Sequence, residues 1–181
     1  NDDTEALEAY LQTGDFDIED GQNILSISRF IPDFKNQKGS ANVLLSFKDY
    51  SATTSETTLN GAITNSATEI NLTESANFPT SGTILIGTEL ITYTGNTTGA
   101  DRLTGCTRGT NGTSAAAHID NKKVINYTNV RINLNNVTPT TTKVDTRGRG
   151  RQGNMLIYSD AVNDKWRFGT LRLDVRPDGG R

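Results

Sequence analysis

Apolar residues in this chain alternate with polar ones in short runs and never form long blocks. The alternation is clear at 70–72 and at 171–175. A period of two places the apolar side chains on one face of a β-strand. Each run is only about five residues long, a normal length for a strand in a small β-domain. The pattern therefore predicts an all-β chain built from many short strands.

Composition agrees with this prediction. Hydrophobic residues make up 33% and aromatic residues 7% of the 181 residues, and 17 glycines stand against 4 prolines. Threonine suits a pleated surface, and glycine suits the tight turns between strands. No run approaches the roughly 18 apolar residues of a membrane-spanning helix. The chain begins at Asn1 rather than Met, so we expect it to be part of something longer.

A change in the pattern of polar and apolar residues divides the chain. A polar stretch, SATTSETT at 51–58, is followed by short alternating runs up to Tyr127. We expect a β-sandwich or barrel-like domain split by an inserted small β-hairpin module. Its first half would span residues 1–55, the insertion 56–127, and its second half 128–181.

Individual elements can be placed on this outline. A short helix fits 2–11, the one helix expected, because Ala6, Leu7 and Leu11 have helical spacing. Gly87 is expected to turn a hairpin, and Gly169 to mark a bulge or kink within a strand. Strands are expected at 24–31, 41–50, 155–159 and 166–177.

The only cysteine, Cys106, and the only histidine, His118, raise the question of a nucleophile with its base. An activated cysteine usually lies at a helix N-terminus beside an imidazole. Here it lies between threonines in a β-type stretch, and nothing marks an oxyanion hole. One cysteine and one histidine cannot close a zinc site. We expect packing for Cys106, a surface or turn role for His118, no enzymatic activity, and no metal or cofactor.

An acidic stretch at 15–21 resembles the opening of a calcium loop. The sixth position of such a loop should be glycine and the twelfth glutamate, but these are Asp20 and Ser26. The stretch is therefore expected to be an acidic turn or a contact between subunits.

Charge is segregated along the chain. Residues 1–60 carry a net −7, residues 61–120 carry −3, and residues 121–181 carry +7. Unlike surfaces of this kind favour contacts between identical subunits. Equally, the two ends could fold against each other within one chain. Residues at the expected subunit interface are Asp15, Asp17, Glu19, Asp20, Arg147, Arg149 and Arg151.

The three arginines have a period of two, which in a strand places them on one face. They suit an acidic protein surface, a nucleic-acid backbone, or a strand edge whose charge deters stray pairing. No aromatic residues are interleaved with them for base stacking. A protein contact is the favoured interpretation, and non-specific proximity to DNA the weaker one.

Two resemblances to known families follow from these stretches. The segment 59–127 is similar to a small β-domain common in bacteriophage tail and baseplate proteins, through TLNGAI, FPTSGTILIGTELITYTG and LTGCTRGTNGTSAAAH. The flanking halves resemble the C-terminal part of the tail nozzle (tail tubular) protein of short-tailed bacteriophages, through GDFDIEDGQNILSISRFIPDF and DTRGRGRQGNMLIYSDAVNDKWRFGTLRLDVRPDGGR.

The resemblance implies a structural virion protein of the phage tail. Its partners would be identical subunits in a hexameric ring around the DNA exit channel, together with adaptor or fibre proteins. Trp166, Phe168, Leu171 and Leu173 would then bury the core. The alternative is a tail-fibre or adhesin module that holds host-surface glycans through the insertion.

Overall fold

The computed structural model describes residues 9–19, 22–49, 55–159 and 161–180. The prediction of an all-β chain is confirmed: strands make up 56% of the structure, all in antiparallel sheets, and no barrel closes. Thr98–Ala100 forms a single 3-10 turn. None of the described residues forms a helix long and apolar enough to cross a membrane.

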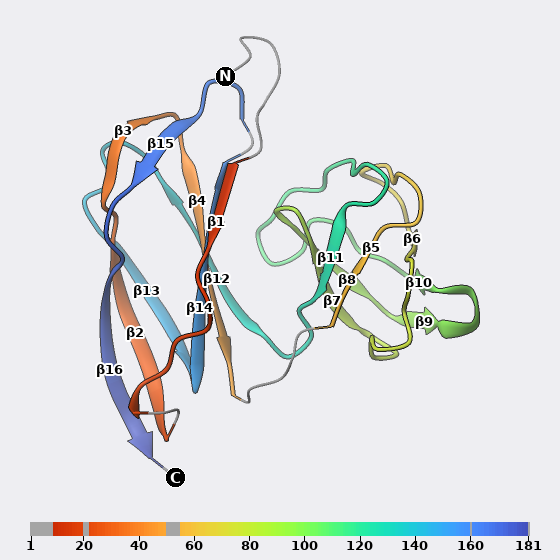
Figure 1. Ribbon diagram of the computed structural model, residues 1–181, viewed down its shortest axis with the longest axis horizontal. Coiled ribbons are helices and arrows are strands. Elements are labelled where there is room, and N and C mark those ends of the chain that lie inside the picture. The colour runs from red at the N-terminus through yellow and green to blue at the C-terminus, as the bar shows by residue number, and fades with distance from the viewer. Residues whose placement is uncertain (1–8, 20–21, 50–54, 160, 181) are drawn as a thin grey trace. The chain divides into compact units, whose positions relative to one another are not determined.

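The chain divides into two compact units (Figure 1). Unit 1 combines 1–51 with 130–181, and unit 2 consists of 52–129. The expected insertion, 56–127, thus differs from unit 2 by a few residues at each end. Since the chain leaves unit 1 and later returns to it, the strands of unit 1 come from both ends of the sequence.

Unit 1 contains a four-stranded antiparallel sheet. Its order across the sheet is β1-β14-β4-β12. The strands are β1 (Ala9–Gln12), β4 (Ala41–Lys48), β12 (Arg131–Val137) and β14 (Gln152–Ser159). The central strands β4 and β14 are almost continuously buried, which explains their dense apolar sequences ANVLLSFK and QGNMLIYS.

A second sheet of unit 1 has the order β13-β2-β16, and a two-stranded ribbon pairs β15 with β3. The strands are β2 (Asn23–Ile31), β3 (Phe34–Lys38), β13 (Val144–Gly150), β15 (Lys165–Phe168) and β16 (Arg172–Gly180). Strand β2 ends directly before Pro32, as expected, because proline has no N–H to donate to the ladder.

The two larger sheets of unit 1 pack face to face as a β-sandwich (Figure 1). The core lies between them, and both sheets contribute to it. Its buried residues are Leu25, Ile27, Phe30, Ala41, Val43, Leu45, Phe47, Val137, Met155 and Ile157. The four residues expected to form the core, Trp166, Phe168, Leu171 and Leu173, are only partly buried and pack at its margin.

One glycine allows the two sheets to approach closely. A Cβ built on Gly148 of β13 would lie 1.7 Å from the ring of Phe47 on β4. Phe47 is almost fully buried and has little room to move. Glycine is therefore required where β13 crosses this ring.

Unit 2 is built from two small antiparallel sheets, with orders β5-β11-β7-β8 and β6-β10-β9. The strands are β5 (Glu56–Thr58), β6 (Glu69–Asn71), β7 (Gly82–Ile86), β8 (Glu89–Tyr93), β9 (Gly95–Thr97), β10 (Arg102–Thr104) and β11 (Lys123–Asn126). Gly87, with φ of 57°, lies in the tight turn between β7 and β8, so the expected hairpin is confirmed. The core of unit 2 is separate and includes Cys106.

Two local predictions are wrong. Ala9–Gln12, which covers the end of the expected helix at 2–11, is strand β1 and pairs with β14; the remainder of that helix lies outside the described residues. The expected continuous strand through Gly169 is two strands, β15 and β16, in different sheets. Gly169 donates its N–H to the carbonyl of Asp33, at the point where the chain changes sheets.

Candidate functional site

Cys106 is not an activated nucleophile. Its side chain is 6% exposed within the core of unit 2. Burial raises the pKa of the thiol to about 11, and Glu69 adds to the rise although Arg108 opposes it. The thiol therefore stays protonated near neutral pH, whereas nucleophilic attack needs the thiolate.

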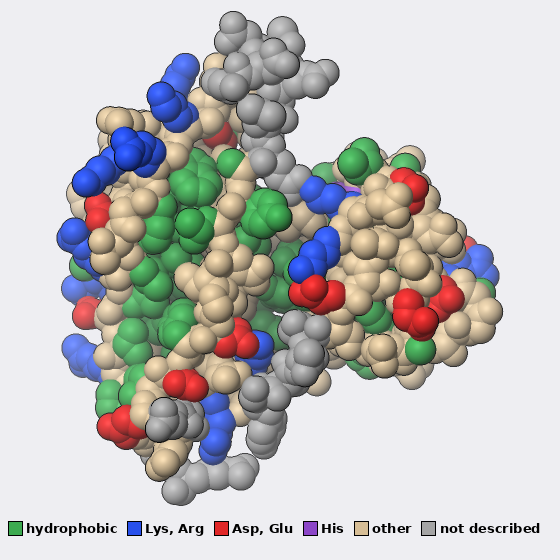
Figure 2. Space-filling view, in the orientation of Figure 1, with side chains coloured by type: hydrophobic (Ala, Val, Ile, Leu, Met, Phe, Trp, Pro, Cys, Tyr) green, Lys and Arg blue, Asp and Glu red, His purple; other side chains and the backbone are tan. Residues whose placement is uncertain are grey.

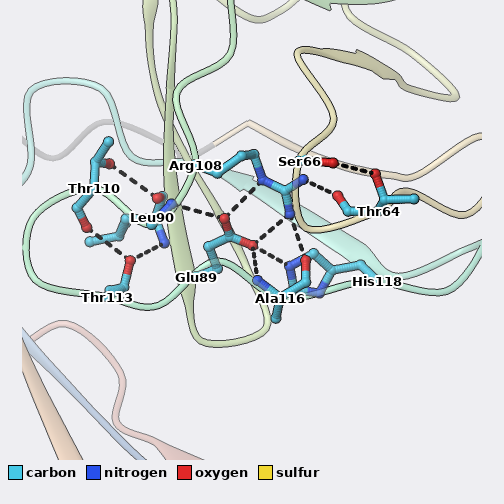
Figure 3. A network of polar contacts seen from close by, with 10 residues as sticks. Thr64, Ser66, Glu89, Leu90, Arg108, Thr110, Thr113, Ala116 and His118 are labelled. Carbon is cyan, nitrogen blue, oxygen red and sulfur yellow. Dashed lines mark hydrogen bonds and ion pairs between the residues drawn. The ribbon is translucent and has the colours of Figure 1, made fainter.

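The expected surface or turn role of His118 is wrong, because its side chain is buried and contacts Glu89. The Glu89 side chain is fully buried at the start of β8. Arg108 donates two parallel hydrogen bonds to it, from Nε to Oε1 at 2.8 Å and from Nη2 to Oε2 at 2.7 Å. His118 places Nε2 2.8 Å from the same Oε2 (Figure 3). A charged, two-pronged pair of this kind is among the strong interactions of proteins.

Two backbone groups complete this arrangement. The N–H of Gly109 donates to Oε1 at 2.9 Å, and the N–H of Ala116 donates to Oε2 at 3.1 Å. Arg108 in turn donates to the carbonyls of Thr64 and Ala116 (Figure 3). We call this set, Glu89, Arg108, Gly109, Ala116 and His118, the Glu89 clasp.

Electrostatics keep the Glu89 carboxylate ionised. Burial would raise its pKa, but hydrogen bonds from Arg108, Ala116, His118 and Gly109 outweigh that effect, and the net pKa lies below the ordinary value of 4.5. A buried charge is tolerated when it is paired and fully hydrogen-bonded.

The geometry of the Glu89 clasp indicates a structural role. Its donors come from 108–118 and converge on one carboxylate, so they hold that loop against strand β8. The five contacts occupy both carboxylate oxygens, and a substrate would have to displace them. The sequence drew attention to His118 but not to Glu89 or Arg108. The available signal was an acidic residue at the start of the mostly apolar strand β8.

Arg147 and Arg149 lie on exposed positions of β13, alternating with buried Thr146, Gly148 and Gly150. The expected shared face therefore holds for two of the three arginines. Arg151 follows the end of β13 and is partly buried. A register shift between Asp145 and Gly148 interrupts the pairing of β13 with β2.

Three of the residues expected at the subunit interface have partners elsewhere in the described part of the chain. Arg149 pairs with Asp178 of β16, at 3.0 Å. Asp15 pairs instead with Lys48, at 2.6 Å. Glu19 accepts a hydrogen bond from Asn23.

Two further residues of the acidic stretch, Asp17 and Asp20, are expected at the subunit interface. Asp17 is exposed, and Asp20 lies outside the described residues. Contact of these acids with Arg147, Arg149 and Arg151 between different copies of the chain stays a prediction.

A basic groove of about 470 Å³ lies beside β13. Arg131, Arg147 and Arg149 line it, together with Asn133 and serines of β2. Arg131 is held by Asp49, with Nη1 3.0 Å from Oδ2, and this hydrogen bond is the main cause that lowers the pKa of Asp49. Two of the three arginines thus have acidic partners already.

Side chains close one side of the sandwich of unit 1. On the β12–β13 side, Arg131 Nε donates to the carbonyl of Arg149 at 2.9 Å, and Asn133 Nδ2 donates to Thr146 Oγ1 at 3.2 Å. These bonds tie the edge of one sheet to the edge of the other.

The opposite side, between β1 and β16, is open. Each of these strands pairs on only one side in the part of the chain that the structure describes. Leu11 lies opposite core residue Ile157, and Val175 lies opposite core residue Ile27, so both face the interior. Yet they are 38% and 37% exposed. Figure 2 shows hydrophobic side chains gathered between the two strands.

Within the described ranges, no group of three or more His, Cys, Asp or Glu side chains is placed to hold a metal ion. A comparison with models of known protein families finds no match. A comparison with curated proteins finds none either.

Proposed function

We propose that this chain is a structural subunit of a bacteriophage tail, in the region of the tail nozzle. In this proposal identical subunits form a ring around the DNA exit channel and contact adaptor or fibre proteins. Support comes first from the sequence resemblances of 14–34, 59–127 and 145–181. The proposed location is the virion, and the role is mechanical rather than catalytic.

The observation that carries the proposal is the open side of the unit 1 sandwich. An unpaired strand edge presents free N–H and C=O groups, a ready template for another strand. Here two such edges, β1 and β16, flank partly exposed core residues such as Leu11 and Val175. A second copy of the chain would cover these apolar groups and pair the free edge of β16. The segregated charges of the two chain ends favour such contacts between copies.

The polar clusters of the molecule agree with a structural role. The Glu89 clasp uses its carboxylate entirely for internal bonds. The arginine-rich strand β13 is tied to β12 and β16. These groups stabilise loops and edges, which is what a subunit under mechanical load requires.

The test is self-association of the whole chain, with Val175→Glu as the variant. A charge at this edge would have to be buried between copies, and we expect association to weaken by roughly tenfold or more. Ile119→Glu is the matched control, because Ile119 is a 73% exposed apolar residue of unit 2. Sedimentation velocity over a range of concentrations measures both. A wild-type chain that stays monomeric alone and beside adaptor proteins would refute the proposal.

The glycan-binding alternative finds less support. Sugar-binding sites commonly use exposed aromatic rings, but the three aromatic residues of unit 2, Phe78, Tyr93 and Tyr127, are all buried. Binding of the chain to a glycan array, retained in Val175→Glu, would favour the adhesin instead.

A further inference from the structure

The ribbon of β3 and β15 carries four positive charges on one face. Lys165 lies directly opposite Lys38, and Arg167 lies directly opposite Lys35. All four side chains are exposed. Figure 2 shows Lys and Arg side chains gathered at this end of unit 1. We call these four residues the basic ribbon. Like charges directly opposite each other destabilise a strand pair. The arrangement of the four cations therefore does not serve the stability of the fold.

A bulge in β3 creates this common face. Lys35 and Lys38 are three residues apart and would point to opposite faces of a regular strand. The register shifts between Lys165 and Arg167, and Asn36 has a left-handed φ of 53°. The extra residue turns Lys38 back to the side of Lys35.

Aromatic rings fix the ribbon from its other face. The ring of Phe34 lies 5.9 Å from Trp166 in an edge-to-face arrangement and 5.5 Å from Phe168. Trp166 donates from Nε1 to Ser159 Oγ at 2.9 Å, and Gln37 Nε2 donates to the carbonyl of Val137 at 2.7 Å. These ring contacts and hydrogen bonds therefore hold the backbone that carries the four charges in place.

The basic ribbon has no acidic partner among the residues that the structure describes. The two nearest acids in sequence are engaged elsewhere. Asp164 Oδ1 accepts the N–H of Ser40 at 3.2 Å. Asp33 Oδ2 accepts the N–H of Thr170 at 3.0 Å and pairs with Arg172. On the neighbouring sheet, by contrast, Arg29 lies between Asp145 and Asp174. The positive charges of the basic ribbon are thus not neutralised by any acidic side chain among the described residues.

We propose that the basic ribbon binds the phosphate backbone of DNA without reading its sequence. Charges about 7 Å apart along a strand and about 5 Å apart across the pair form a dense array for regularly spaced phosphates. Lysine is depleted in protein–protein interfaces, and three of the four residues are lysines. The aromatic rings point inward, so no ring is offered for base stacking. The inference rests on the proposed position beside the DNA exit channel.

The experiment measures binding of the whole chain to a fluorescently labelled double-stranded DNA of arbitrary sequence by anisotropy, over a salt series. Lys38→Gln with Lys165→Gln removes two charges from the ribbon. We expect the slope of log K against log salt to fall by about two, and affinity at about 50 mM salt to fall on the order of a hundredfold. The matched control is Lys122→Gln with Lys123→Gln in unit 2, which removes the same charge and should keep the wild-type slope.

The proposal would be overturned by any of three results of the DNA titration: no binding at low salt, an equal loss in the control, or an unchanged slope. Polyglutamate is the competing probe. If it binds the ribbon more tightly than DNA does, the surface belongs to an acidic protein. Trp166 fluorescence checks that the double variant is folded. Sedimentation separates this test from the proposed function, because the variant should lose DNA binding and still associate.

Discussion

Glu89 shows how one residue can be charged and fully buried at once. Removing a carboxylate from water is costly, and only a complete set of partners offsets the cost. Arg108 supplies the opposite charge, while Gly109 and Ala116 supply backbone donors. The loop 108–118 is therefore fixed by one side chain that lies 19 to 29 residues away along the chain.

Replacing Glu89 by glutamine should strongly destabilise unit 2. The change leaves the Arg108 guanidinium buried without a counter-charge, and we expect the free energy of unfolding to fall by about 3–5 kcal/mol at neutral pH. Urea denaturation measures it. Glu56→Gln is the control in the same unit, because its pair with Lys123 is half exposed on both sides and should contribute less than about 1 kcal/mol.

Acid should remove the same stabilisation. The pKa of Glu89 is lower folded than unfolded, so its contribution is complete above the ordinary value of 4.5 and is lost as pH falls through the folded pKa. The difference between wild type and Glu89→Gln should therefore shrink as pH falls below about 4.5. A difference that stays constant down to pH 3 would show that ionisation of Glu89 is not what stabilises the loop.

At the scale of elements, strand β3 is one that the alternation of apolar and polar residues does not predict. Its sequence FKNQK has one apolar residue, and no strand was predicted there. It forms because Phe34 packs against Trp166 and Phe168 of a distant segment. The bulge at Asn36 then decides which faces its lysines occupy.

This bulge should depend on the left-handed conformation of Asn36. Valine is strained at a φ of 53°, whereas glycine adopts it freely. We expect Asn36→Val to lower the free energy of unfolding by about 1 kcal/mol, and Asn36→Gly to change it little. Equilibrium denaturation followed by Trp166 fluorescence measures both. Equal effects of the two variants would mean that the bulge geometry does not matter.

At the scale of the whole molecule, the two units have separate hydrophobic cores. A structure with two cores can unfold in two steps, because loss of one core need not expose the other. The sandwich is also asymmetric, closed by β12 and β13 on one side and open between β1 and β16 on the other.

Calorimetry should therefore resolve two transitions that respond to different variants. Glu89→Gln should lower only the transition of unit 2. Gly148→Ala should affect only the transition of unit 1, since its Cβ would overlap the Phe47 ring. We expect it to lower the free energy of unfolding of that unit by about 1–3 kcal/mol. Gly14→Ala is the control in unit 1, because nothing lies within 4 Å of its Cβ. A single transition shifted by both variants would contradict independent cores.

The sequence by itself determined the all-β class, the hairpin at Gly87 and the end of β2 before Pro32. These depend on alternation and on the backbone limits of glycine and proline, which act within a few residues. Only the tertiary structure decided that Glu89 would receive Arg108 and His118, that Arg149 would pair with Asp178, and that four cations would share one ribbon. Each of these depends on segments far apart in the chain, and strand pairing, register and bulges set such distances rather than local preference.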